Sequence, residues 1–236
     1  MKRFALSTRK STSDRMLEIA FLAFTAALFS APLSAAQTMQ KGISVQLAST
    51  TGAASLPEAD NSDAWIVTVT EQGTLYFGVD PVTPEGLVEA MKAHPRIHGQ
   101  NLYIKADARV PFTCVNRVLE AAHANLFNSA FLLTGQPTGL PAGTIIPPKG
   151  LPIWLAAQSP SVVVHVSSGQ GSPRLTINNE VVPIKGLEHK LGLLLQNQSD
   201  RVVVLEVEQV PFADVAHVVD VCNMAGAKTV VETPRL

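Results

Sequence analysis

The sequence predicts an α+β fold class: one N-terminal transmembrane helix, then two tandem small mixed-sheet domains, each with two helices on one sheet face. Three observations support this prediction. A long apolar stretch lies near the N-terminus, two stretches one hundred residues apart repeat the same apolar pattern, and each of them alternates short apolar runs with helical periodicity.

The apolar stretch runs from Met16 to Ala36, and Glu18 is its only charged residue. At helical rise it is about 30 Å long, enough to cross the hydrocarbon core of a membrane. Five basic residues precede it, which predicts a cytoplasmic tail at 1–15 and translocation of everything after the helix. The small-residue run at 34–36 also fits a cleavable signal peptide. Both interpretations place residues 37–236 outside the cytoplasm, and they differ in whether the anchor is retained.

Glu18 has two interpretations of its own. A carboxylate inside a membrane helix is costly and tends to mark an ion or proton pathway, and a low dielectric raises its pKa toward neutrality. Alternatively, Glu18 lies at the membrane interface and pairs with Arg15.

The repeat is clearest around Val-Pro-Phe, which occurs at 110–112 and again at 210–212. In both places the following apolar residues recur at i, i+3, i+4 and i+7, the pattern of one buried helix stripe. Upstream, the apolar runs at 102–104 and 202–204 match at the same offset and indicate buried strands. After the second helix the offset becomes ninety-nine, which one deletion explains, and Gly226 is a suitable helix C-cap there.

Each copy is therefore predicted to run strand, strand, helix, strand, helix, strand. The ranges are 65–70, 74–79, 84–93, 101–106, 112–125 and 130–134 in the first copy, and 161–167, 174–178, 183–195, 201–207, 212–224 and 228–232 in the second. An additional strand is predicted at Ile43–Leu47. The predicted organisation is an early strand and tether at 37–64, domain 1 at 65–134, a Pro/Gly linker without regular structure at 135–152, and domain 2 at 153–236.

The sequence offers no catalytic or metal-binding constellation, so we expect no enzymatic activity, no metal and no cofactor. Pro95 separates His94 from His98, and Asp107 is interpreted as a turn or cap residue. Cys222 occupies a helix core position. A net charge of -1, with no basic run beyond residue 15, argues against nucleic-acid binding.

The segment Leu-Tyr-Ile-Lys-Ala-Asp-x-x-Val-Pro-Phe at 102–112, with the helix and strand that follow it, resembles the periplasmic domain of the ExbD/TolR family. Residues 77–83 are similar to the strand and turn before that family's first helix. Residues 31–33 and 42–47 are similar to the end of its membrane helix and its first periplasmic strand. The family supplies accessory subunits of proton-driven energy-transducing complexes in inner membranes.

The resemblance implies roles for particular residues. Glu18 lies fourteen positions before Pro32, where the family has an essential aspartate, so the resemblance favours a retained anchor and a proton-coupling Glu18. It implies an ExbB/TolQ-like channel subunit around the helix and a TonB- or TolA-like partner, or peptidoglycan, in the periplasm. The early strand is the candidate partner-binding edge, formed by Ser44, Val45, Gln46 and Leu47.

The chain departs from the family pattern in having glutamate at position 18, an unfamiliar segment before it, and a second unit. The second unit predicts a homodimer or an internal pseudo-dimer. The alternative function is a non-motor periplasmic binding module with a cleaved signal peptide.

Overall fold

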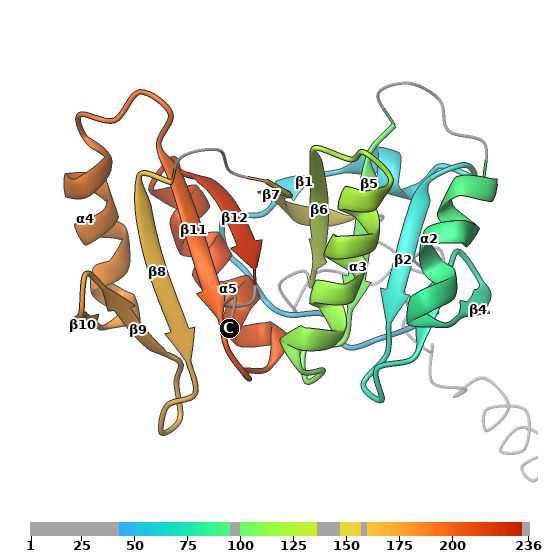
Figure 1. Ribbon diagram of the computed structural model, residues 1–236, viewed down its shortest axis with the longest axis horizontal. Helices are drawn as coiled ribbons and strands as arrows, with labels where there is room; N and C mark the ends of the chain where they lie inside the picture. Colours follow the sequence, from blue (N-terminus) through green and yellow to red (C-terminus); the bar gives the residue numbers. More distant parts are fainter. Residues whose placement is uncertain (1–42, 95–99, 136–146, 157–159, 233–236) are drawn as a thin grey trace, which may run out of the picture. The chain divides into compact units, whose positions relative to one another are not determined.

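The computed structural model describes residues 43–94, 100–135, 147–156 and 160–232, and all of them belong to one compact unit. Their strands form a single twelve-stranded mixed sheet in the order β10-β9-β8-β11-β12-β7-β6-β5-β2-β3-β4, with β1 paired to β7 (Figure 1). The predicted α+β class with mixed strand directions is therefore confirmed.

The first half of the sheet follows the predicted element order. Its elements are β2 (Trp65–Val69), β3 (Leu75–Phe77), β4 (Asp80–Val82), α2 (Pro84–Ala93), β5 (Leu102–Ala106), α3 (Phe112–Ala124) and β6 (Ser129–Thr134). Strand β5 is parallel to both β2 and β6, and β2, β3 and β4 form an antiparallel meander. The sequence did not predict β4, because Gly78 and Pro81 make this three-residue strand look like a turn.

The second half has the same element order and the same pairings within it. Its elements are β8 (Val162–Ser167), β9 (Arg174–Ile177), β10 (Glu180–Val182), α4 (Ile184–Leu195), β11 (Val202–Val207), α5 (Phe212–Met224) and β12 (Lys228–Glu232). Strand β11 is parallel to β8 and β12, while β9 pairs antiparallel with β8 and β10.

The expectation that 135–152 lacks regular structure was wrong, because β7 (Lys149–Trp154) begins inside that range. Strand β7 is antiparallel to β6 along its whole length and pairs with β12 at Trp154 and Val230. Its side chains alternate, with Leu151 and Ile153 buried and Pro152 exposed. This alternation outweighs the proline and glycine content, because it buries two large side chains in the core.

The predicted strand at Ile43–Leu47 was also wrong, since no strand is present there. The segment forms hydrogen bonds with residues that follow strands rather than with a strand. The Gln46 carbonyl accepts a bond from the turn after β5, and Ser49 forms an isolated β-bridge with Gly135 after β6. We refer to residues 44–52 as the strap. The tether that follows it contains β1 (Ala54–Ser55) and the 3-10 helix η1 (Pro57–Asp60).

The main core lies between the sheet and helices α2, α3, α4 and α5, and it is continuous through both halves. A small second cluster lies where η1 covers the other face of the first half, formed by Leu56, Ala59, Ile66, Tyr103 and Leu133. The predicted membrane segment lies outside the described residues. Among the described residues, no helix is long and apolar enough to cross a membrane.

Candidate partner-binding site

Of the residues predicted to carry function, Glu18 lies outside the described part of the chain. The four candidates for partner binding, Ser44, Val45, Gln46 and Leu47, form the first part of the strap. Ser44 and Gln46 are exposed, while Val45 and Leu47 are partly buried. The structure therefore brings these four residues together, although not as a strand.

Asp107 fixes the start of the strap. The Gln46 amide donates a hydrogen bond of 3.1 Å to Asp107 Oδ2, and the Gln46 carbonyl accepts one of 2.7 Å from the amide of Ala108. Asp107 is only 3 % exposed, and it accepts two further bonds from the guanidinium of Arg109, from Nε at 2.9 Å and from a terminal nitrogen at 3.0 Å. The hydrogen bonds from Arg109 lower the pKa of the Asp107 carboxyl, although its burial acts in the opposite direction.

The opposite backbone edge of the strap carries no such bonds. In an extended chain successive residues direct their backbone groups to alternate sides, so the groups of Gln46 and Ala48 face the body of the protein. The backbone groups of Val45 and Leu47 make no hydrogen bond to any described residue. This edge is able to pair with another extended segment.

Asp220, on α5 of the second half, fixes the end of the strap. Its carboxylate accepts bonds from the amide of Thr51 at 2.8 Å, from the Thr51 hydroxyl at 3.1 Å and from the amide of Gly52 at 3.0 Å. Asp220 is 1 % exposed, so these three donors replace the water that a buried carboxylate loses. Gly52 must approach closely, because a Cβ there would lie 2.9 Å from both Asp220 Oδ1 and Met224 Cγ.

The two halves also meet at their Val-Pro-Phe segments. Pro111 and Pro211 precede α3 and α5, and neither helix has a side-chain cap. Instead, the Phe112 amide donates to the Val210 carbonyl at 2.9 Å, and the Phe212 amide donates to the Val110 carbonyl at 2.8 Å. Each half thus satisfies an unpaired N–H group at the start of the other half's helix. The contact is reciprocal, like that of a two-fold dimer.

The sequence interpretation missed Asp220, although a signal was present. Helix α5 is buried on most sides, and Asp220 interrupts an apolar run between Val219 and Val221. A carboxylate inside such a helix requires hydrogen-bond donors from outside the helix. Within the described residues, no group of three or more His, Cys, Asp or Glu side chains is placed to hold a metal ion.

Comparison with protein families gives a match to the model of the biopolymer transport protein ExbD/TolR over residues 16–136. This match covers half of the chain. The chain belongs to the ExbD/TolR family. No curated protein and no solved structure matches it.

The match places the first half of the sheet, the strap and the N-terminal apolar stretch within one ExbD/TolR unit. The family consists of accessory subunits of energy-transducing biopolymer transport, which are associated with the inner membrane and work with ExbB/TolQ and TonB/TolA. The second half of the sheet, from β8 onward, lies beyond the matched residues.

Proposed function

We propose that this protein is an accessory subunit of an inner-membrane complex that uses the proton-motive force to drive biopolymer transport. Residues 16–36 span the membrane, the N-terminus is cytoplasmic, and both halves of the sheet are periplasmic. Glu18 binds and releases protons within an ExbB/TolQ-like channel. The family match supports this proposal, because it begins at Met16 and so includes the apolar stretch that carries Glu18.

The proposal depends on how the strap is attached to the two halves. It begins eight residues after Ala36, and hydrogen bonds fix it at Asp107 of the first half and at Asp220 of the second. A displacement of the membrane helix would therefore pull on a segment attached to both halves. We infer that the strap passes this displacement to the periplasmic domains.

In this proposal the partner engages the outer edge of the strap. The unpaired backbone groups of Val45 and Leu47 suit an extended segment of a TonB- or TolA-like protein, or of a peptidoglycan-associated partner. The second half arose by duplication of the first and takes the position of a second protomer, which makes the chain an internal pseudo-dimer. The reciprocal contact between Val110–Phe112 and Val210–Phe212 supports this arrangement.

Substitution of Glu18 tests the motor role. Glu18→Gln removes the titratable group with almost no change in volume, so we expect loss of transport with normal membrane insertion and normal assembly with the channel subunit. Glu18→Asp, which restores the family's usual carboxylate, should retain activity. The measurements are proton-dependent transport in cells and co-purification of the channel subunit. Full transport by Glu18→Gln would contradict the proposal.

The second candidate function is a non-motor periplasmic binding module, and the small-residue run at 34–36 favours it. N-terminal sequencing of the mature protein separates the two. A mature protein that begins at Gln37 would establish the binding module, whereas an intact N-terminus is required for proton coupling.

A further inference from the structure

The sheet ends in two short edge strands, β4 in the first half and β10 in the second (Figure 1). Their pairings are identical at an offset of one hundred residues. Pro81 of β4 stands opposite Tyr76 of β3, and Val181 of β10 stands opposite Thr176 of β9. The two strands are therefore equivalent edges, and they differ in the residues that occupy them.

Proline closes one of these edges. Pro81 has no N–H group, and an edge strand accepts proline where the nitrogen is directed away from the neighbouring strand. The shared register gives Val181 the same orientation, so its N–H and C=O groups both face outward. Beyond its pairing with β9, Val181 makes no backbone hydrogen bond to a described residue. The edge of β10 is therefore able to pair where that of β4 is not.

An open hollow of about 610 Å³ adjoins the edge of β10. Its lining residues come from the turn between β8 and β9, from the start of β9 and from Val181–Lys185, and all of them belong to the described part of the chain. Val181 itself is 53 % exposed. A segment that paired with β10 would cover this apolar side chain and remove it from water.

The hollow is basic. Arg174 and Lys185 line it, both are exposed, and neither forms an ion pair within the described residues. The equivalent positions in the first half are occupied by Thr74 and Glu85, so the end of β4 lacks this positive charge. An unpaired pair of cations beside an open sheet edge favours an acidic occupant.

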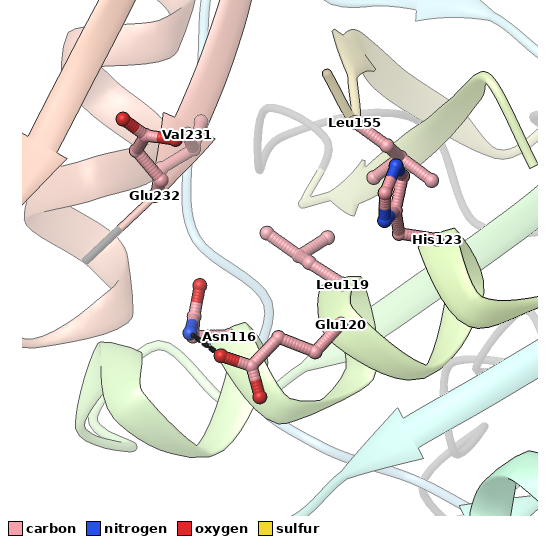
Figure 2. Close-up of a pocket in the computed structure, with 7 residues that line it drawn as sticks. All are labelled: Asn116, Leu119, Glu120, His123, Leu155, Val231 and Glu232. Carbon is pink, nitrogen blue, oxygen red and sulfur yellow. Dashed lines mark hydrogen bonds between the residues drawn. The ribbon is translucent and has the colours of Figure 1, made fainter. Parts of the chain in front are cut away.

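A smaller hollow of about 200 Å³ has the opposite charge. It lies between α3 and the end of β12, and Figure 2 shows Glu120 and Glu232 across from each other in its lining. An acidic ligand is repelled by these carboxylates and attracted by Arg174 and Lys185. This hollow therefore provides a control position for the charge of the basic one.

We propose that β10 and the basic hollow bind an extended, acidic segment of a partner protein. The backbone of the segment pairs with Val181, and an aspartate or glutamate side chain of the segment lies between Arg174 and Lys185. The site is in the second half, beyond the residues that match the family, and it does not require proton coupling by Glu18.

A second copy of the chain is a poorer occupant. Its β4 is closed by Pro81. Its β10 supplies Glu180 as the only carboxylate of the strand, and Glu180 already forms an ion pair of 2.8 Å with Lys190. The acidic group is therefore expected to come from another protein.

Peptide binding to the full chain in detergent micelles tests the site. The probe is the fluorescent peptide Ser-Val-Thr-Val-Glu-Thr-Asp, measured by fluorescence anisotropy beside the same peptide with glutamine and asparagine in place of its acidic residues. We expect the acidic peptide to bind at least about fivefold more tightly and to lose that advantage at high salt. No binding of the acidic peptide, or equal binding of the two peptides, would overturn the proposal.

Val181→Pro tests the backbone pairing. It gives β10 the residue that β4 carries in the same register, so the fold should be retained while peptide binding is lost. Pro81→Val is the matched control and should leave binding unchanged, because the end of β4 lacks the two cations. Circular dichroism confirms that each variant is folded. Undiminished binding to folded Val181→Pro would place the peptide elsewhere and overturn the site.

Charge variants test the hollow. Arg174→Glu and Lys185→Glu should each reduce the preference for the acidic peptide, and the double variant should abolish it, whereas Glu120→Gln should leave it unchanged. A preference that persists in the folded double variant would contradict the role of the two cations. Sedimentation velocity without peptide tests the other occupant: self-association that Val181→Pro abolishes would assign the edge to a second copy and overturn the proposal.

Discussion

Two buried carboxylates, Asp107 and Asp220, hold the N-terminal strap against the sheet. Each is almost inaccessible to solvent, and each accepts hydrogen bonds from strap amides. A buried carboxylate without donors is unstable, so each aspartate depends on the strap as much as the strap depends on it. The two differ in their other partners, because Asp107 also receives the guanidinium of Arg109.

This difference makes the stability of the protein depend on Asp107 at acid pH. Its pKa is lower in the folded protein than the usual 3.8, because Arg109 and backbone amides bond to the charged form. The resulting stabilisation is complete above the unfolded-state pKa and is lost as the pH falls through the folded-state pKa. We therefore expect Asp107→Asn to reduce the decline in the free energy of unfolding below about pH 4, relative to the unsubstituted protein.

Urea unfolding of the full chain at a series of pH values, followed by tryptophan fluorescence, measures this dependence. Asp80→Asn is the matched control, because Asp80 is exposed. An unchanged acid dependence in Asp107→Asn would mean that Asp107 does not stabilise the fold through its charge.

At the scale of elements, the strap is a short extended segment whose order comes almost entirely from tertiary contacts. It has no strand partner along its length, and hydrogen bonds attach it near Gln46, at Ala48 and at Thr51–Gly52. Segments of this kind open locally at a lower free energy than core strands do. A small steric change at one attachment point should therefore release that end without unfolding the sheet.

Gly52→Ala is such a change. The new Cβ would lie 2.9 Å from Asp220 Oδ1 and from Met224 Cγ, so the strap must shift. We expect a destabilisation of about 1–3 kcal/mol, confined to the strap. Amide hydrogen exchange of the segment 44–55, measured by mass spectrometry, should accelerate while exchange in β5 and β11 stays unchanged.

Two further variants serve as controls for the hydrogen-exchange experiment. Met224→Ala combined with Gly52→Ala removes one of the two close contacts and should restore part of the protection. Ser49→Ala, at an exposed strap position, should leave exchange unchanged. Exchange in Gly52→Ala that matches the unsubstituted chain would show that the approach of Gly52 to Asp220 contributes little.

At the scale of the whole molecule, two halves of like construction share one sheet and one core. Strand β7 joins them along β6 and at Val230, and the Val-Pro-Phe segments bond reciprocally. The reciprocal bonds have the form of a two-fold interface, in which the same surface serves both sides.

Removal of the second half should therefore expose a self-complementary surface. We expect a chain that ends at residue 147 to associate as a dimer through Val110–Phe112. Sedimentation velocity in a fixed detergent measures this, since the truncated chain should contain twice as many protomers per particle as the full chain. If the truncated chain is folded and has the same number of protomers per particle as the full chain, the two halves do not form a two-fold interface.

Most elements of the fold were predictable because their signals are local. The helices α2, α3, α4 and α5 show helical periodicity in their apolar residues, and their observed bounds differ from the predicted ones by one residue or less. The strands β2, β5, β8 and β11 each begin with at least three consecutive apolar residues. Strands β1, β4 and β10 were not predicted because they have only two or three residues, and β7 was not predicted because it begins in a stretch rich in proline and glycine.

The candidate site was predictable only in part, for a related reason. The sequence indicated Ser44–Leu47 as an interacting segment and placed Asp107 in a turn, which the bond from the Val110 amide to the Asp107 carbonyl confirms, but it did not link Asp107 to the strap and it overlooked Asp220. Hydrogen bonds from Thr51 to Asp220 join residues 169 positions apart. A pairing over that distance leaves no mark in local periodicity, and it follows only from the way the two halves meet.

The sequence by itself determined most of the order of elements within each half, because that order is recorded in the spacing of apolar residues, and its motifs resemble those of the family that the comparison then showed. The tertiary structure decided that the two halves share one sheet through β7 and that the strap is bonded to both of them. These features depend on which backbone and carboxylate groups find partners after the chain has folded, and such partners are distant in sequence.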